Sequence, residues 1–472
     1  MADQACLQLE PKIADKSAQV CIIGLGYVGL PLAKAFAQSG YRVAGLDLDV
    51  HKVASLAEGR SYIPDVESGD VASLVRQGLF HPTTDYEVLR QVDVVFICVP
   101  TPFDAMKAPD LSFIRSAAEG IAPRLHAGQL VVLQSTTFPG TTEEVVQPIL
   151  ESSGLKAGVD FGLAFSPERI DPGNKVFTVS NTPKVVGGLT SLCARLAASL
   201  LGQITPQVHV VSTPRAAEMT KLLENIFRSV NIALVNELAL LSERMGIDFW
   251  EVVQAASTKP FGFMPFYPGP GVGGHCIPVD PYYLSWKARE FDFYTKFIEL
   301  AAEVNQSMPY HVVERVGQAL SARGKPLAGA RVLILGVAFK RDIDDARNSP
   351  AGRVIELLLN AGAQVAYNDP YVPRYSVGRD VFYPDEIALE SQALVPDLLA
   401  AQDVVVIVSG HRVYDYPWIV QHAALVVDTV NATQGVWQGH NKIVRIGAPF
   451  SHRTFAEPAG PFDSRPVRFR KT

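Results

Sequence analysis

The residue with the clearest chemical potential is a cysteine in a loop of glycine and proline. Residues 268–281 have the sequence PGPGVGGHCIPVDP, which places Cys276 directly after His275 and four residues before Asp280. Glycines leave the backbone N–H groups of a loop unshielded, and a cysteine beside such donors can act as a thiolate nucleophile. The alternative is a buried structural cysteine. Buried cysteines usually lie in apolar segments, as Cys98 does, so the loop favours a nucleophile.

A glycine fingerprint near the N-terminus predicts a dinucleotide site. Gly24, Gly26 and Gly29 follow a short apolar run and open a helical pattern, which would bring a pyrophosphate onto the helix N-terminus. Asp47 lies 21 residues after the middle glycine, where a carboxylate accepts from ribose hydroxyls and repels a 2′-phosphate. The pattern predicts NAD rather than NADP, against the alternative of a turn required only for packing. Lys52 could touch the adenosine half or be a solvated lysine.

Polar residues follow other expected strands at the edge where open α/β sheets bind ligands. Thr101 lies in the segment VPTP at the end of one strand, and Ser135 and Thr136 follow the next. Because Pro, Ser and Thr are common in turns, a turn without function is the alternative. Glu168, in the segment FSPER, follows a further apolar run and could act as a general base.

Two further polar groups have both a functional and a structural interpretation. Lys221 and Asn225 lie one turn apart on one face of an expected helix, where they could bind a developing oxyanion or simply face solvent. Lys340 and Arg347 belong to a charged loop after a second, degraded fingerprint, where a phosphate site would lie. Ion pairing within that loop is the alternative.

The elements that must position these residues alternate between apolar strands and helices. Apolar runs occur at 19–23, 41–46, 93–99 and 129–133. The alternation begins again at Ala328, with strands expected at 331–335, 364–369, 403–408 and 425–429. Long helical patterns at 212–256 and 287–323 lie between them. This order predicts an α/β fold with two Rossmann-like, parallel and doubly wound domains joined by a helical central region.

The same pattern predicts where the chain divides. The expected parts are an N-terminal extension 1–17, an NAD-binding domain 18–205, a helical central region 206–324 with the cysteine loop, a C-terminal Rossmann-like domain 325–450 and a tail 451–472. The apolar positions of the central helices suit a helix that bridges domains or pairs with a symmetry mate.

Composition and charge argue against several function classes. A net charge of −6 without a long basic run before the tail argues against nucleic acid as a partner. No apolar stretch approaches the roughly 20 residues of a membrane helix, and residues 1–16 lack the features of a signal peptide or anchor. The five cysteines form no CxxC pair or metal-like spacing, so we expect no metal and a reducing cytoplasm.

Together the motifs resemble the UDP-glucose/GDP-mannose dehydrogenase family over residues 18–445. The motifs GLGYVGLP, VPTP, SPER, Lys221-x3-Asn225, GGHCIPxDP and GxAFK occur in the family's order. The resemblance implies a four-electron oxidation of a sugar C6 hydroxyl with two NAD. Cys276 would capture the aldehyde as a thiohemiacetal, the second oxidation would leave a thioester, and water would release the acid.

The resemblance also implies roles for single residues. Lys221 and Asn225 would stabilise oxyanions, Asp280 would help to activate water, and Glu168 would take part in thioester hydrolysis. The C-terminal domain would bind uridine diphosphate. The middle helices would form the interface of a homodimer or a higher homo-oligomer. The expected catalytic residues are Cys276, Lys221, Asn225, Asp280, Glu168 and Thr136. The expected NAD-binding residues are Gly24, Gly26, Tyr27, Val28, Gly29, Asp47, Lys52, Thr101, Ser135 and Arg347. The expected substrate-binding residues are Glu168, Arg169, Lys221, Asn225, Tyr267, Gly273 and Lys340.

Within the family, residues 258–271 and 168–174 are similar to the bacterial UDP-N-acetylglucosamine 6-dehydrogenase branch. Members that act on UDP-glucose often carry an arginine before the glycine loop, whereas this chain has TKPF at 258–261. We therefore expect UDP-N-acetylglucosamine as substrate, for surface polysaccharide precursors, ahead of UDP-N-acetylmannosamine and UDP-glucose. Two alternative hypotheses lie outside the family: a single-step hydroxyacid dehydrogenase of the 6-phosphogluconate type, and a non-catalytic NAD-binding or scaffold protein.

Overall fold

The computed structural model describes residues 4–104, 108–171, 173–174, 176–274, 277–379 and 383–450. His275, Cys276 and the expected tail at 451–472 lie outside the described residues. The chain forms two compact units: residues 1–228 with 279–299, and residues 229–278 with 300–472. The expected central region at 206–324 is therefore divided between the two units.

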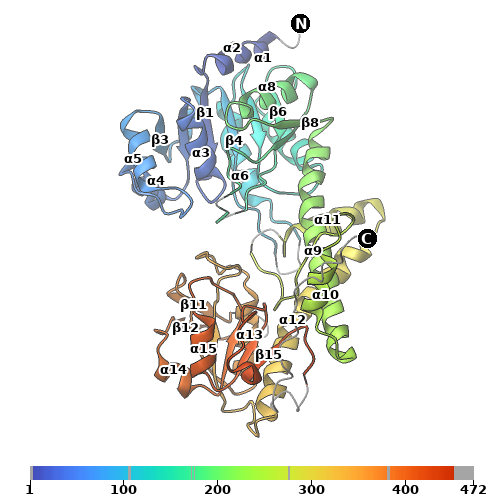
Figure 1. Ribbon diagram of the computed structural model, residues 1–472. Coiled ribbons are helices and arrows are strands. Elements are labelled where there is room, and N and C mark those ends of the chain that lie inside the picture. The colour runs from blue at the N-terminus through green and yellow to red at the C-terminus, as the bar shows by residue number, and fades with distance from the viewer. Residues whose placement is uncertain are drawn as a thin grey trace, which may run out of the picture. The chain divides into compact units, whose positions relative to one another are not determined.

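The first unit is built on an eight-stranded sheet with the strand order β3-β2-β1-β4-β5-β6-β7-β8 (Figure 1). Its strands are β1 (Gln19–Ile23), β2 (Arg42–Leu46), β3 (Phe80–Thr83), β4 (Val94–Ile97), β5 (Leu130–Leu133), β6 (Gly162–Phe165), β7 (Lys184–Gly188) and β8 (Val208–Val211). The four strands expected here from apolar runs are β1, β2, β4 and β5, and their pairings are parallel, as predicted.

Alternate residues of these strands pack on opposite faces of the sheet. Val20 and Ile22 join the core that includes α3, whereas Cys21 and Ile23 join the core that includes α6. Burial on both faces explains why the strands are nearly continuous apolar runs, and it confirms the doubly wound prediction. The helices of this unit are α1 (Gln4–Leu7), α2 (Leu9–Ala14), α3 (Gly29–Gln38), α4 (Val50–Ala57), α5 (Ser68–Arg76), α6 (Ser112–Ile121), α7 (Gln147–Glu151), α8 (Ser191–Leu201) and α11 (Asp280–Ala288), with the first half of α9 (Pro214–Met245).

One strand pairing departs from the parallel prediction. β7 pairs antiparallel with β6, with Ala164 opposite Gly188 and Phe165 opposite Gly187, and β8 then runs parallel to β7. A parallel neighbour requires a crossover, usually a helix, whereas the described residues between β6 and β7 contain none. The prediction of a parallel, doubly wound sheet therefore holds for the other pairings of this sheet, and this one pairing is antiparallel.

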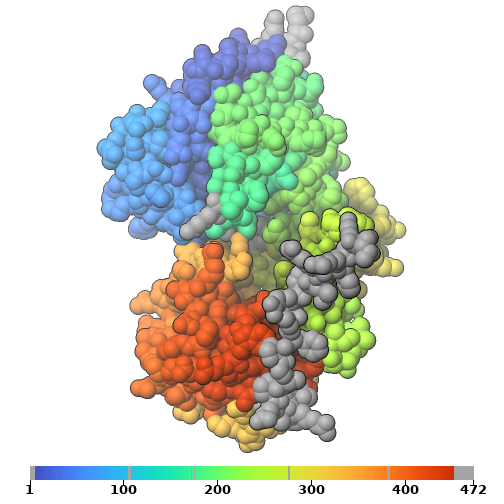
Figure 2. Space-filling view, viewed as in Figure 1, coloured from blue at the N-terminus to red at the C-terminus, as the bar shows by residue number. Residues whose placement is uncertain are grey.

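The N-terminal extension contributes to the core of the first unit. Leu9 and Ile13 of α2 are buried, and Tyr41 Oη donates to the carbonyl oxygen of Ile13 at 2.7 Å. α2 packs against α8, as the dark blue surface beside the green surface shows in Figure 2. The extension is thus an integral part of the Rossmann-like unit.

The second unit contains a parallel sheet with the order β10-β9-β13-β14-β15. Its strands are β9 (Arg331–Leu335), β10 (Gln364–Asn368), β13 (Val404–Ile407), β14 (Val426–Asp428) and β15 (Ile443–Arg445), beside the hairpin β11 (Arg374–Val377) and β12 (Ile387–Glu390). The four expected strands are confirmed, and β15 and the hairpin were not predicted. The helices are α10 (Phe249–Ala256), α12 (Lys296–Ser321), α13 (Pro350–Asn360), α14 (Pro396–Ala401) and α15 (Tyr416–His422), with the second half of α9.

The helical run expected at 287–323 is interrupted in the structure. α11 ends at Ala288, and α12 begins only at Lys296, after Asp292 has adopted a left-handed φ of 52°. A left-handed residue ends a helix because the following N–H can no longer reach a carbonyl one turn back. Within the described residues, none of the helices has the length and apolar character needed to cross a membrane.

Candidate functional site

The three glycines of the N-terminal fingerprint occupy their positions for different structural reasons. Gly24 has a φ of 91°, and a Cβ atom there would lie 2.5 Å from the carbonyl oxygen of Cys98. A Cβ atom at Gly29 would lie 1.8 Å from the carbonyl oxygen of Gly24. A Cβ atom at Gly26, in contrast, would meet no atom within 4 Å. Packing therefore requires the outer two glycines, whereas the open space at Gly26 suits a ligand that approaches the backbone closely.

Asp47 joins the end of β2 to this glycine turn. Its Oδ2 accepts from the backbone N–H of Leu25 at 2.8 Å, and Lys52 Nζ lies 3.8 Å from the same oxygen. Tyr62 Oη donates to the carbonyl oxygen of Leu25 at 2.7 Å and so fixes the turn from the other side. The Asp47 side chain remains 13% exposed, so its carboxylate can still accept from a ribose hydroxyl. These residues fit the adenosine half of NAD.

Three of the expected site residues follow neighbouring strands at the same edge of the sheet. Thr101, Ser135 and Glu168 come after β4, β5 and β6, which are adjacent and parallel. Ser135 Oγ donates to the carbonyl oxygen of Val99 at 2.8 Å, and the carbonyl oxygen of Thr101 accepts from Tyr283 Oη of α11. Thr136, next to Ser135, is partly exposed. The carboxyl edge of the sheet therefore gathers these residues, as the sequence predicts.

Asn225 of α9 and Asp280 at the start of α11 form a buried polar pair. Asn225 Nδ2 donates to Asp280 Oδ2 at 2.5 Å, and both residues are less than a tenth exposed. Burial raises the pKa of Asp280 to about 6, although the charge of Lys221 and the hydrogen bond from Asn225 act in the opposite direction. The structure thus brings together three of the expected catalytic residues. It also excludes a solvated helix face for Lys221 and Asn225, which are both 7% exposed.

The carboxylate of Glu168 is held by several donors. Lys184 Nζ lies 2.9 Å from Oε1 and 2.7 Å from Oε2, and Gln134 Nε2 donates to Oε2 at 2.7 Å. Arg169 pairs with Glu224 Oε1 at 2.7 Å, and its expected contact with substrate stays a prediction. Lys184 was missed by sequence reasoning. The only available signal was a charged residue opening the apolar run KVVGG, and that signal does not reveal the partner.

The glycine loop before the cysteine is anchored within the second unit. A Cβ atom at Gly273 would lie 2.8 Å from the carbonyl oxygen of Asn348. Gly274 has a φ of 89°, its N–H donates to the carbonyl oxygen of Arg347 at 3.1 Å, and its own carbonyl accepts from Asn348 Nδ2 at 3.1 Å. Both glycines are therefore required by close packing against the charged loop that follows β9.

Other expected residues of the second unit have defined surroundings. The guanidinium of Arg347 forms two hydrogen bonds with Asp345, at 2.8 and 2.6 Å. Tyr267 is 53% exposed and stacks on Trp250 of α10, with ring centroids 6.1 Å apart. Lys340 is partly exposed. Their predicted contacts with NAD or substrate stay predictions.

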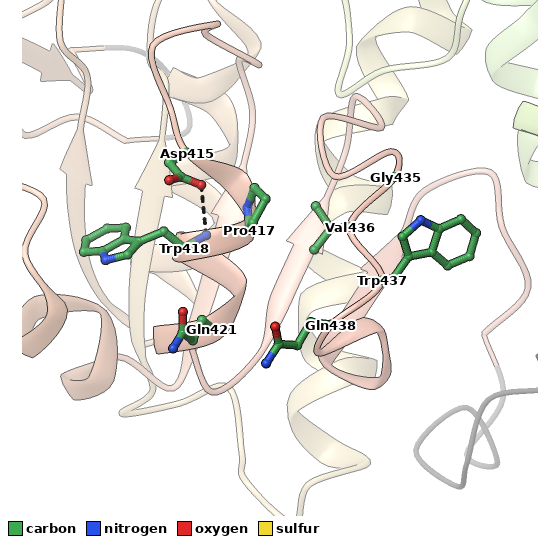
Figure 3. A pocket seen from close by; sticks show the side chains of 8 residues that line it. All are labelled: Asp415, Pro417, Trp418, Gln421, Gly435, Val436, Trp437 and Gln438. Carbon is green, nitrogen blue, oxygen red and sulfur yellow. Dashed lines mark hydrogen bonds between the residues drawn. The ribbon is translucent and has the colours of Figure 1, made fainter. Parts of the chain in front are cut away.

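A depression of about 450 Å³ lies between α15 and the loop after Thr433 (Figure 3). Trp418 and Gln421 line it from α15, and Gly435–Gln438 line it from the loop. Asp415 is its one ionisable lining residue, and its carboxylate caps α15 by accepting from the N–H of Trp418 at 3.0 Å. None of the expected site residues lines it, and we assign it no part in the chemistry.

Comparison with known families places three matches along the chain. They are the NAD binding domain of the UDP-glucose/GDP-mannose dehydrogenase family at residues 18–205, its central domain at 215–307 and its UDP binding domain at 333–435.

Two curated relatives have similar sequences over most of their length. A UDP-N-acetyl-D-glucosamine 6-dehydrogenase of Pseudomonas aeruginosa is 41% identical over 76% of this chain and 84% of its own. A UDP-N-acetyl-D-mannosamine dehydrogenase of Pyrococcus horikoshii is 36% identical over 75% of this chain and 84% of its own. Among solved structures, a UDP-D-ManNAc dehydrogenase of Pyrococcus horikoshii superimposes with a TM-score of 0.81 at 31% identity, covering 91% of this chain and 99% of that one.

Proposed function

The chain belongs to the UDP-glucose/GDP-mannose dehydrogenase family and is an NAD-dependent UDP-sugar dehydrogenase, and from this premise we propose that it oxidises C6 of UDP-N-acetyl-D-glucosamine to the uronate. The reaction removes four electrons, two at each of two oxidations. Each NAD, when bound, accepts one hydride. The product would serve as a precursor of surface polysaccharide, made in a reducing cytoplasm where a thiolate nucleophile persists.

The residues of the first unit suit the first oxidation. Asp280 is buried and lies within reach of the charge of Lys221, so it can accept the proton that leaves the C6 hydroxyl as the hydride departs. Lys221 and Asn225 can donate to the oxygen as negative charge develops on it. The Asn225–Asp280 hydrogen bond is the observation that carries this assignment. It joins two residues 55 positions apart in the sequence, on α9 and α11, and so places the proposed donor and the proposed base side by side.

The covalent steps belong to Cys276, which lies outside the described residues. Its thiolate would add to the aldehyde carbon, giving a thiohemiacetal. Loss of a second hydride would leave a thioester. Water would then add to the acyl carbon, and the C–S bond would break, which releases the carboxylate and restores the thiolate. In the second unit, Tyr267, Gly273 and Lys340 are our candidates for contacts with the UDP-sugar.

The choice of sugar rests on the segments at 258–271 and 168–174 and on the absence of arginine at 258–261. The 41% identical relative is named for UDP-N-acetyl-D-glucosamine. Relatives named for UDP-N-acetyl-D-mannosamine are 34–38% identical, so that epimer is the second candidate. The two sugars differ at C2, and the pocket must distinguish the orientation of one acetamido group.

A panel of UDP-sugars tests both the reaction and the substrate. We expect two NADH per UDP-N-acetylglucosamine consumed, and a product whose mass matches the uronate. A higher kcat/KM for the mannosamine epimer would move the assignment to that sugar. One NADH per substrate would indicate a single-step hydroxyacid dehydrogenase. The Cys276→Ser variant should bind NAD but form no acid, and unchanged turnover in it would contradict the covalent route.

A further inference from the structure

Two asparagines are buried between α9 and α12 in the second unit. Asn236 of α9 has no exposure to solvent, and Asn305 of α12 is 6% exposed. Asn236 Nδ2 donates to Asn305 Oδ1 at 3.0 Å, and Asn305 Nδ2 donates to the carbonyl oxygen of Ser229 at 3.1 Å. Ser229 lies about two turns before Asn236, so the two residues share one face of α9. We call Asn236 and Asn305 the asparagine pair.

The remaining oxygen of Asn236 is used outside the two helices. Asn236 Oδ1 accepts from the backbone N–H of Gly269 at 3.0 Å, in the glycine loop that leads to Cys276. The three bonds point in one direction, from the loop through both amides to the carbonyl oxygen of Ser229. Neither amide can turn without breaking a bond. The acceptor that meets the loop is therefore held at a defined point.

Asn305 also contacts the loop through its backbone. Pro309 lies four residues later inside α12 and has no N–H, so it cannot complete the helical hydrogen bond to the carbonyl oxygen of Asn305. Gly271 packs at this position. It has a φ of 125°, and a Cβ atom there would lie 3.2 Å from that carbonyl oxygen and 3.5 Å from Pro309 Cδ. The glycine loop is thus fitted to α12 as well as bonded to α9.

Helix packing alone does not account for the asparagine pair. Helices associate well through apolar side chains, and burying an amide is costly unless its polar atoms are bonded. A leucine has the same number and branching of side-chain heavy atoms as an asparagine and needs no such partners. Leucine cannot, however, provide an acceptor for Gly269. The bond to the glycine loop is therefore what the pair supplies and an apolar contact would not.

We propose that the asparagine pair consists of positioning residues, which fix the glycine loop at Gly269 and so place the thiolate of Cys276 for attack on the aldehyde carbon. The other end of the described loop is held independently, because Gly274 donates to Arg347 and accepts from Asn348. These two anchors lie five residues apart, and the second precedes the cysteine by two. This assignment deepens the proposed function and rests on it.

The reactivity of Cys276 can be measured without a sugar. The other four cysteines, Cys6, Cys21, Cys98 and Cys193, are buried. Burial also raises the pKa of the Cys21 and Cys98 thiols, so they react slowly with an alkylating reagent. Iodoacetamide should therefore modify Cys276 first, at a rate followed by intact mass, and Cys276→Ser should remove this fast phase. A parent protein without the fast phase would count against the proposal.

Two leucine variants separate positioning from folding. In Asn236→Leu the N–H of Gly269 loses its acceptor, and we expect kcat to fall about a hundredfold, as a small misplacement of reacting atoms can cause. Alkylation of Cys276 should slow about tenfold as the thiolate loses its surroundings. The KM for NAD should not change, because the NAD binding domain lies in the first unit. Asn236→Leu with Asn305→Leu leaves no unpaired amide between the helices, so it should melt at a higher temperature than Asn236→Leu while both rates stay low.

The rates of the double variant decide between positioning and folding. If the asparagine pair serves only folding, kcat and the alkylation rate return together with the melting temperature, and the proposal is overturned. A folded Asn236→Leu protein that is alkylated at the parent rate would also overturn it. Thermal melting and NAD binding show which variants are folded.

Gln129→Met is the matched control, because it removes another buried amide with two hydrogen bonds. Gln129 Nε2 donates to the carbonyl oxygens of Leu89 and Val92, at 2.9 and 2.8 Å. Gln129 directly precedes β5, so it lies at the edge of the sheet opposite to the one that carries Ser135. The variant should melt at a lower temperature, with kcat and alkylation unchanged. Slower alkylation in it would mean that lost stability alone explains the effect, against the proposal.

The alkylation assay also separates this proposal from the reaction on which it rests. The NADH yield of the parent enzyme is measured first, and a yield other than two per sugar contradicts the proposed four-electron oxidation. Alkylation rates are measured without NAD or sugar, so they decide independently whether the asparagine pair positions the thiolate of Cys276.

Discussion

Asp280 is the residue whose chemistry depends most directly on its surroundings. Burial raises its pKa to about 6, so the carboxyl is protonated, and cannot accept a proton, at lower pH. We expect kcat to fall about tenfold per pH unit below that value, as a single protonation requires. In Asn225→Ala the donor that stabilises the carboxylate is lost, so the pKa of Asp280 should rise. The acidic limb of the pH–rate profile, where kcat falls with decreasing pH, should therefore move to higher pH.

The position of that limb is independent of the overall loss of rate in the variant. Rates measured from pH 5 to 8 for both proteins provide the comparison. Asp280→Asn supplies the control, because a residual rate without an acidic limb identifies the titrating group. An unchanged limb in Asn225→Ala would mean that another group controls the profile.

At the scale of helices and strands, the sequence predicts those elements that a local pattern of apolar residues determines. The apolar runs at 19–23 and 331–335 are confirmed as β1 and β9, because a strand buried on both faces has no polar alternation. The pairing of Lys184 with Glu168 could not be predicted, since it depends on the direction of β7. Whether a chain returns parallel or antiparallel is decided by a connection, here residues 166–183, with no regular spacing to interpret.

The loop after β5 is tied to α9 by Glu218, a second feature that spacing alone does not reveal. Its carboxylate is fully buried and accepts from Gly140 N–H at 2.6 Å and from the N–H and hydroxyl of Thr142 at 2.9 and 2.6 Å. Glu218→Gln places an amide N–H against these donors. We expect a loss of about 2–4 kcal/mol in the free energy of unfolding, measured by urea denaturation.

Activity should fall with stability, because Lys221 lies less than one turn beyond Glu218 on α9 and Thr136 lies on the same loop. The matched control is Glu143→Gln. Glu143 joins the same two elements through Arg215 at 2.6 Å, but both side chains are partly exposed. An exposed pair contributes about 0–1 kcal/mol. Equal losses in the two variants would contradict a special role for the buried carboxylate.

At the scale of the whole molecule, each of the two Rossmann-like units has an aspartate that accepts hydrogen bonds from the backbone of its glycine turn, but the two aspartates differ in exposure. Asp47 anchors the first glycine turn and stays partly exposed. In the second unit Asp369 accepts from the N–H groups of Val337 and Ala338 at 2.7 and 3.0 Å, and also faces His411 at 3.1 Å, with no exposed carboxylate surface. A ribose hydroxyl cannot reach it. This burial explains why the degraded fingerprint need not bind a dinucleotide, and it leaves NAD to the first unit.

The second half of α9 leads to a prediction about assembly. Leu234, Leu238, Leu241 and Met245 are 38–62% exposed and recur at spacings of four, three and four residues, so they form one apolar stripe. Such a stripe is normally covered, and we propose that a second copy of the chain covers it in a homodimer. Leu241→Asp should therefore shift the protein to monomers at micromolar concentration, measured by light scattering after size exclusion. Val413→Asp, at a 62% exposed position on the loop before α15, should leave the dimer intact. A monomeric parent protein would contradict the homodimer, and a dimer that survives Leu241→Asp would place the subunit contact elsewhere.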